Sequence, residues 1–180
     1  MFTDIRSKKV VFVSHCILNQ NAISDGTAVC PAAFREIVEK CLELDIGLVQ
    51  MPCPELMCLG LDRGYPAGAE SPVTVENTRI RREILTDPEK LDRLGSLADS
   101  VIYQMREYKK HGFEILGVIG ANRSPNCGVQ TTSDNDIELP GMGIFMERIA
   151  AGIKELGMDI PMTGIKTSDD LSEKLKKILR

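Results

Sequence analysis

Apolar runs and amphipathic stretches alternate along the chain, and this alternation predicts the order of its elements. Short continuous apolar runs are typical of strands covered on both faces. They predict strands over residues 8–16, 46–51, 113–119 and 160–165. Apolar residues at helical spacing predict helices between them. These helices run from Pro31 through Leu42, from Pro88 to about His111, from Phe145 to Gly157, and from Leu171 to Leu179.

Two helix ends carry recognisable signals. Asp87 is a good N-cap, Pro88 suits the first helical position, and Gly112 is a typical stop. Thr167 and Asp170 have the spacing of a capping box in front of the last helix. Both helices are therefore expected to begin at these residues.

Three segments lack either pattern. Residues 17–28 are polar and are expected to form a loop. Residues 59–86 are rich in glycine, proline and charge, which predicts a long excursion or lid. Residues 121–141 predict a second long loop, and Cys127 lies in it.

Strands that alternate with helices indicate a parallel sheet with right-handed crossovers. A length of 180 residues suits one domain with a sizeable core. We therefore expect residues 1–180 to form a single α/β domain, a three-layer Rossmann-like fold with a mostly parallel sheet of about four strands. In such open sheets, ligands bind at the carboxyl ends of the strands.

Charge and hydropathy narrow the possible partners. The net charge of −4 and the isoelectric point near 5.3 do not fit a protein that binds nucleic acid duplexes. No apolar stretch approaches the roughly 18–20 residues of a membrane span, and the polar start does not resemble a signal peptide. We expect a cytoplasmic protein with a small-molecule substrate and no membrane partner; the sequence leaves the oligomeric state open.

Three of the six cysteines follow predicted strands: Cys16, Cys53 and Cys127. If the strands are parallel, these thiols gather at one edge of the sheet. Three converging thiolates make a soft-metal site with an open coordination position. The chain has no close Cys-x-x-Cys pair of the kind that zinc ribbons use, whereas the ligands of an iron–sulfur cluster can be far apart in sequence. The alternative is three unrelated buried thiols.

The remaining cysteines have simpler interpretations. Cys41 lies on the apolar stripe of a helix and is expected in the core. Cys30 precedes that helix, where packing is the favoured role. Cys58 follows Cys53 by five residues and could be a fourth ligand, but its apolar neighbours favour burial.

The segments around these three cysteines resemble the thiouracil desulfurase family, formerly a domain of unknown function. They read Ser-His-Cys-Ile-Leu-Asn-Gln-Asn, Cys-Pro-Glu and Ser-Pro-Asn-Cys-Gly-Val, and the match covers roughly residues 10–146. The family's commoner Arg-Tyr-Asp-Gly-like segment after the first cysteine is replaced here by Asn-Ala-Ile-Ser-Asp-Gly, so the chain resembles a divergent branch. The resemblance implies a [4Fe-4S] cluster held by Cys16, Cys53 and Cys127, and a hydrolytic, non-redox desulfuration.

The same resemblance implies catalytic roles for Glu55 and Ser124. Glu55 would act as a general base on water, and Ser124 would bond a ring atom or relay a proton. Three amides, Asn19, Asn21 and Asn122, could read a pyrimidine-like edge as substrate-binding residues. Each has a plainer alternative, since Glu55 could cap a helix and the asparagines could hold turns.

Other polar residues receive structural interpretations. His15 is expected to be buried and hydrogen-bonded, not a ligand, because neighbours in a strand point to opposite faces. His111 suits a helix C-terminus. A local basic cluster is expected at the surface, where it could attract a phosphate: Arg63, Arg79, Arg81 and Arg82.

Three hypotheses for function result. The first is a cluster-dependent desulfurase acting on a small thiolated compound. The second is a metal-independent enzyme with a cysteine nucleophile and His15 or Glu55 as its base. The third is a module that binds iron or zinc without catalysis.

Overall fold

The computed structural model describes residues 2–24, 26–64, 73–135 and 137–179, with the backbone alone over 73–78. Its main sheet has the strand order β2-β1-β3-β6, and every neighbouring pair is parallel. The strands are β1 (Lys9–Val13), β2 (Gly47–Gln50), β3 (Glu114–Ala121) and β6 (Met162–Ile165). The prediction of an α/β, Rossmann-like fold with about four parallel strands is confirmed.

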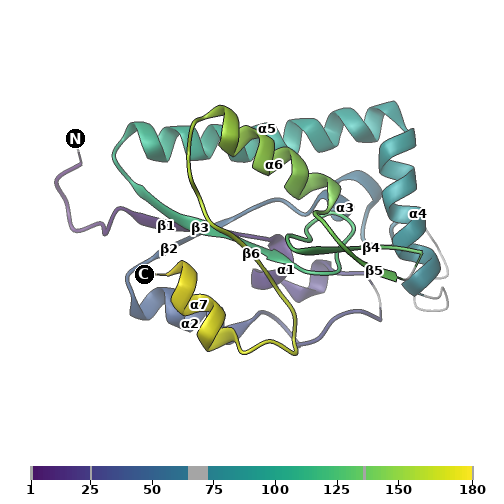
Figure 1. The fold of residues 1–180 in the computed structure, drawn as a ribbon, viewed down its shortest axis with the longest axis horizontal. Helices are drawn as coiled ribbons and strands as arrows, with labels where there is room; N and C mark the ends of the chain where they lie inside the picture. The colour runs from purple at the N-terminus through teal and green to yellow at the C-terminus, as the bar shows by residue number, and fades with distance from the viewer. Residues whose placement is uncertain (1, 25, 65–72, 136, 180) are drawn as a thin grey trace.

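Helices cover both faces of this sheet and make the fold three-layered (Figure 1). The helices α5 (Pro88–Lys110) and α6 (Ile144–Glu155) lie on one face, and α2 (Arg35–Glu43) and α7 (Leu171–Ile178) on the other. The core divides in the same way: Phe12 of β1 packs in the first cluster, while Val11 and Val13 pack in the second. This follows from the alternation of side chains along a strand.

The starts of α5 and α7 depend on side-chain caps. The Asp87 carboxylate accepts hydrogen bonds from the backbone N–H groups of Glu89 and Lys90, at 3.0 and 3.4 Å, and α5 then runs to Lys110 as predicted. The capping box predicted at Thr167 is wrong. Asp170 is the N-cap of α7 and accepts from the Glu173 N–H at 3.1 Å.

Part of the predicted excursion is a regular helix. Residues 73–86 form α4 (Val73–Thr86), and Ile80 and Ile84 on it are fully buried. The prediction of irregular structure is therefore wrong for this half, because two apolar residues at i and i+4 were hidden among charged neighbours. Residues 65–72, the rest of the glycine- and proline-rich stretch, lie outside the described residues. A short helix, α3 (Pro54–Leu59), precedes the excursion.

The second predicted loop contains a hairpin of β4 (Thr131–Asp134) and β5 (Ile137–Pro140), paired antiparallel. Its first strand reads Thr-Thr-Ser-Asp, so it lacks the apolar run that would have predicted a strand.

The chain between β1 and α2 also differs from expectation. The first strand ends at Val13, and two short helical turns follow, α1 (His15–Leu18) and η1 (Gln20–Ala22). The helix α2 begins at Arg35 and not at Pro31, because the N–H of Phe34 donates to the Ile17 carbonyl at 2.9 Å and holds the preceding residues against α1.

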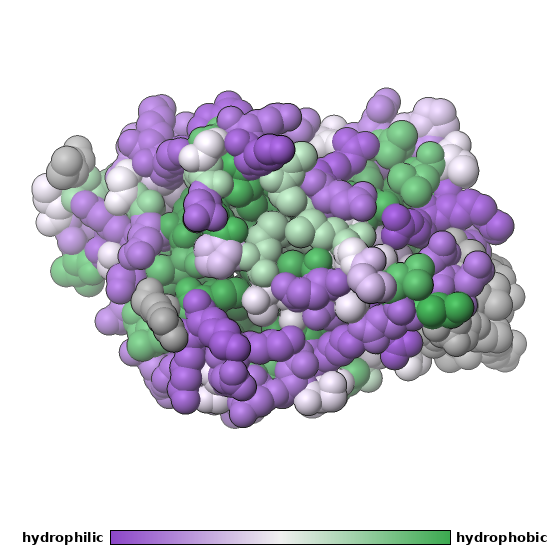
Figure 2. Space-filling view, viewed as in Figure 1, coloured by the Kyte–Doolittle hydropathy of each residue, from purple (hydrophilic) through white to green (hydrophobic). Residues whose placement is uncertain are grey.

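Figure 2 shows hydrophobic surface in the region between α6 and α7, framed by hydrophilic residues above and below. None of the helices in the described part of the chain combines the length and apolar character that a bilayer span requires.

Candidate functional site

A cavity of about 410 Å³ opens at the carboxyl edge of the sheet. The cavity lies between the ends of β1 and β3, which are neighbours in the sheet. From β1 the chain continues to β2 on one side, and from β3 it continues to β6 on the other side. This reversal of direction makes the position between β1 and β3 the topological switch point of the sheet. Residues that follow all four strands line it, among them His15, Cys16, Cys53, Glu55, Ser124, Cys127 and Lys166. The structure thus brings the three sequence-predicted thiols to one cavity.

Each thiol is placed by a different local structure. Cys16 is the second residue of α1, and Cys53 is the N-cap of α3, where its Sγ accepts from the Leu56 N–H at 3.4 Å. Cys127 lies in the loop between β3 and β4, and its N–H donates to the Ser124 Oγ at 2.9 Å.

The Cys127 loop fits only because glycines flank it. A Cβ atom on Gly128 would lie 2.1 Å from the Thr131 carbonyl oxygen, and one on Gly143 would lie 2.4 Å from the Asn126 carbonyl carbon. The first N–H groups of α6 are satisfied by this loop, since the N–H of Ile144 donates to the Pro125 carbonyl at 3.0 Å. The Cys-Gly and Gly-Met-Gly segments therefore pack the loop onto the start of α6.

Burial makes the thiols weak acids. It raises the pKa of Cys16 to about 12 and that of Cys53 to about 11, with added repulsion from the Glu55 carboxylate in both cases. Burial also raises the pKa of Cys127 well above 9.0, and the neighbouring thiolates of Cys16 and Cys53 would raise it further. Three thiols that disfavour one another's ionisation require positive charge before they can all become thiolates.

The three thiols that line the cavity are candidate ligands for a multi-iron cluster. Within residues 2–24, 26–64, 73–135 and 137–179, no three His, Cys, Asp or Glu side chains form a group that could hold one metal ion. The thiolates of a four-iron cluster bind different iron atoms, so they stand farther apart than donors around a single ion. Cys16, Cys53 and Cys127 come from three separate segments of the chain and line one cavity, so they are the residues that could hold such a cluster.

The other cysteines are placed elsewhere. Cys41 is fully buried between α2 and the sheet, which confirms its prediction as a core residue. The Cys58 thiol donates to the Lys90 carbonyl at 3.7 Å, toward α5, and does not line the cavity. Cys30 is half-buried just before α2, near enough to raise the pKa of Cys16 slightly.

Glu55 is held by three donors. It lies in the first turn of α3, where its Oε2 accepts from the Arg63 Nε at 3.2 Å and from the Ser24 hydroxyl at 3.4 Å. Its Oε1 accepts from the Asn126 Nδ2 at 3.0 Å. The carboxylate therefore has a defined position in the wall of the cavity.

Arg63 corrects the expectation of a solvated basic cluster. Its side chain is 1% exposed and forms the ion pair with Glu55. Arg79 and Arg81 are half-buried on α4, and Arg82 is exposed, so the four do not form one patch. Sequence reasoning missed Arg63 because an arginine in a glycine-rich stretch carries no signal of burial.

Ser124 lines the cavity and shapes the Cys127 loop. Its Oγ accepts from the backbone N–H groups of Asn126 and Cys127, at 3.2 and 2.9 Å. Neither bond uses the hydroxyl hydrogen, which is left for a further acceptor.

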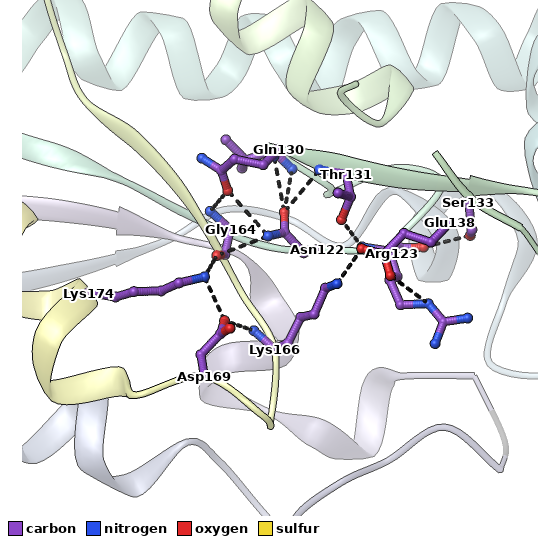
Figure 3. A network of polar contacts seen from close by, with 11 residues as sticks. Asn122, Arg123, Gln130, Thr131, Ser133, Glu138, Gly164, Lys166, Asp169 and Lys174 are labelled. Carbon is purple, nitrogen blue, oxygen red and sulfur yellow. Dashed lines mark hydrogen bonds and ion pairs between the residues drawn. The ribbon is translucent and has the colours of Figure 1, made fainter. Parts of the chain in front are cut away.

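The three asparagines named as substrate-binding are engaged in structural bonds. The Asn122 Oδ1 accepts from three backbone N–H groups between residues 129 and 131, and its Nδ2 donates to the Gln130 side chain and the Gly164 carbonyl (Figure 3). Asn122 lines the cavity, but substrate binding would break these bonds. The Asn19 Oδ1 accepts from both nitrogens of Asn21 and caps η1; neither residue lines the cavity.

His15 lines the cavity without the partner expected for it. Its Nε2 is buried and has no hydrogen-bond partner among the described residues, in contrast to the hydrogen bond expected for this side chain. Burial lowers the pKa of His15 and favours its neutral form. His111, by contrast, caps the end of α5 as predicted.

The mouth of the cavity carries paired charges. Lys166 and Arg123 both line it, and both pair with Glu138 of β5, the arginine Nε at 3.7 Å (Figure 3). Asp169 accepts from the Lys166 N–H and the Lys174 ammonium, each at 2.6 Å. The Lys166–Glu138 pair joins the loop after β6 to the hairpin, and the Asp169 bonds join this loop to α7.

Comparison with known proteins gives one curated relative and one distant fold likeness. No family model matches the chain. A solved [4Fe-4S]-dependent thiouracil desulfidase covers 93% of this chain and 98% of its own, with a TM-score of 0.46 and 17% identity; a likeness this distant carries no argument about the reaction. The uncharacterized protein MJ0003 of Methanocaldococcus jannaschii is 30% identical over 156 residues, which are 87% of this chain and 85% of the relative. The chain therefore belongs to the same family as MJ0003.

Proposed function

We propose that the protein is an iron–sulfur-dependent desulfurase that replaces the sulfur of a small thiocarbonyl compound, such as a thiouracil, by oxygen and releases sulfide. The observation that carries this proposal is the lining of one cavity by Cys16, Cys53 and Cys127 together with the held carboxylate of Glu55. The motif resemblance to thiouracil desulfurases supports the same reaction class.

The three thiols would hold a [4Fe-4S] cluster in this account. A cluster with one iron free of protein ligands supplies a soft Lewis acid, which prefers the sulfur of a thiocarbonyl group to its oxygen counterpart. The cavity of about 410 Å³ is within the size range of small-molecule sites.

Glu55 would act as the general base. Among the described residues its Oε1 has one donor, the Asn126 Nδ2, and so keeps room to accept a proton from water. General-base assistance typically raises a rate by about 10²–10⁴. Ser124, whose hydroxyl hydrogen is not used by its two backbone partners, would donate to a ring atom of the substrate.

The overall reaction needs water alone. The carbon–sulfur double bond is replaced by a carbon–oxygen double bond, the oxygen comes from water, and the two water hydrogens leave with sulfur as hydrogen sulfide. Carbon and sulfur keep their oxidation states, so no electron donor enters the balance.

A metal-independent cysteine nucleophile is disfavoured by the site. Nucleophilic cysteines have lowered pKa values, whereas burial raises the pKa of Cys16 to about 12 and that of Cys53 to about 11. A non-catalytic iron module is distinguished by experiment, since it would bind iron and leave thiouracil unchanged.

Anaerobic reconstitution with iron and sulfide tests the proposal. We expect a coloured protein with about four iron atoms per chain, which releases sulfide from 2-thiouracil without any reductant. A protein that takes up the iron and releases no sulfide from thiopyrimidines would contradict the proposed function, and one that requires a reductant would indicate a redox reaction.

A further inference from the structure

Arg63 combines two features that are unusual for an arginine. Its side chain is only 1% exposed, and its backbone φ is 55°, in the left-handed region that side chains other than glycine seldom adopt. A buried cation is stable only when other groups hydrogen-bond or pair with it. A strained backbone conformation such as this φ persists only where contacts with the surrounding structure stabilise it. The contacts of the guanidinium therefore indicate what this side chain does.

The guanidinium joins three parts of the cavity wall. Its Nη2 donates to the Ala22 carbonyl at 2.6 Å, and its Nη1 donates to the Gly60 carbonyl at 2.7 Å. Its Nε donates to the Glu55 Oε2 at 3.2 Å. Because the guanidinium is planar and rigid, the two carbonyls fix the position of Nε and, through it, the position of the carboxylate.

The hydrogen bonds divide the two oxygens of Glu55 unequally. In the described part of the chain, the Oε2 accepts from Arg63 and Ser24, while the Oε1 accepts only from Asn126. An ionised carboxylate offers about four lone-pair positions. These three donors occupy three of the positions, and the position that no described residue occupies is on Oε1.

We infer that Arg63 is a positioning residue, which holds Glu55 by its Oε2 and thereby makes Oε1 the atom that accepts the proton from water. This inference rests on the proposed function and deepens it, since it names the reacting oxygen and the residue that orients it. Lysine cannot replace Arg63 in this role, because a single ammonium does not reproduce the fork that reaches both carbonyls and the carboxylate.

A double-mutant cycle tests this role, with Arg63→Lys, Glu55→Gln and the double variant. We expect Arg63→Lys to lower kcat for sulfide release about tenfold or more, with KM changed by less than about twofold and the iron content unchanged. In the Glu55→Gln background, the same change should have little further effect on kcat. Urea unfolding of the cluster-free protein gives a readout independent of activity, and there the two substitutions should also be non-additive.

A matched control separates positioning from loss of stability. Ile84 is fully buried on α4 and does not line the cavity. Ile84→Val should lower the free energy of unfolding of the protein and leave kcat unchanged. If Arg63→Lys does not fold, Ser24→Ala removes the other donor to Oε2 and should lower kcat by a smaller factor, again only while Glu55 is present.

Additive effects on kcat in the cycle, or equal losses for Arg63→Lys and Ile84→Val, would overturn the inference and leave the proposed function standing. Wild-type protein that carries the cluster and releases no sulfide would overturn both.

Discussion

The Nδ2 of Asn126 donates to the Oε1 of Glu55 at 3.0 Å, although 71 residues separate the two in sequence. Glu55 stands two residues after Cys53, and Asn126 immediately precedes Cys127. This bond therefore links two of the loops that carry the thiols. It also places a fully buried amide against the reacting side of the proposed base.

Asn126→Ala should lower activity without unfolding the protein. A hydrogen bond to a charged group contributes about 1.5–3 kcal/mol, which corresponds to about tenfold or more in kcat if it orients Glu55 for the reaction. The Oδ1 of Asn126 has no partner among the described residues, so removing this oxygen breaks no hydrogen bond and should lower the free energy of unfolding only slightly. Sulfide release and iron content check this, with Gln104→Ala on α5 as a remote amide control. Loss of iron in Asn126→Ala would show that the amide supports the loop and not the base.

Serine substitutions should separate the ligands from the other cysteines. Cys16→Ser, Cys53→Ser and Cys127→Ser should each abolish or greatly weaken iron binding after anaerobic reconstitution, because a hydroxyl is a poor ligand for iron in such clusters. Cys58→Ser and Cys30→Ser should keep the iron. Iron analysis of each variant is the measurement, and loss of iron in Cys58→Ser would indicate a fourth protein ligand and contradict an open position.

Cys41→Ser should act on stability alone. The side chain is fully buried in the apolar cluster that α2 and α7 share, where a hydroxyl is more polar than the thiol it replaces. Burying it should lower the free energy of unfolding by about 1–3 kcal/mol. Urea unfolding measures this loss, and iron content equal to that of the wild type is the second part of the expectation.

Gly128→Ala should disrupt the Cys127 loop. The added Cβ would lie 2.1 Å from the Thr131 carbonyl oxygen, a contact that only a backbone shift can relieve. We expect reduced iron binding and lower stability together. Gly95→Ala is a matched control, because its Cβ would meet only the end of the Arg148 side chain, at 3.3 Å. Wild-type iron content in Gly128→Ala would contradict the tight packing described for this loop.

The cluster-free protein should lose stability as the pH rises above about 9. Folding raises the pKa of Cys16 to about 12 and that of Cys53 to about 11, from 9.0. Between these values the unfolded chain binds fewer protons than the folded one, so the free energy of unfolding falls with pH, by up to about 1.4 kcal/mol per pH unit for each thiol. Urea unfolding at pH 8 and pH 10 measures the slope.

The control for this pH dependence is a variant with alanine at positions 16, 53 and 127. It should lose clearly less stability than the wild-type chain over the same interval. An equal loss in both proteins would assign the effect to other groups that titrate in this range, and would contradict the burial of the three thiols.

Continuous apolar runs made the sheet predictable. Val10 to Val13 reads as a strand buried on both faces, Phe113 to Ile119 reads as a further strand, and parallel order follows from the helices between the strands. The convergence of Cys16, Cys53 and Cys127 on one cavity required only that each thiol follow the end of such a strand. Local pattern and simple topology were sufficient for this part of the site.

The remainder depends on contacts that no local pattern records. The burial of Arg63 requires the Ala22 carbonyl, 41 residues earlier in the chain, and the position of Glu55 requires Asn126, 71 residues later. The strand β4 reads Thr-Thr-Ser-Asp, and Glu138 of β5 reaches the cavity only through its partners Arg123 and Lys166, which line it. Hydrogen-bond partners this far apart in sequence can be identified only from the three-dimensional structure.

Isotope labelling tests the central claim most directly. The reconstituted protein would be incubated anaerobically with 2-thiouracil in oxygen-18 water, without reductant, and the product analysed by mass spectrometry. The account predicts uracil that carries one oxygen-18 atom, and one sulfide released for each uracil formed. Product without the label, or sulfide that appears only when an electron donor is added, would contradict a hydrolytic desulfuration.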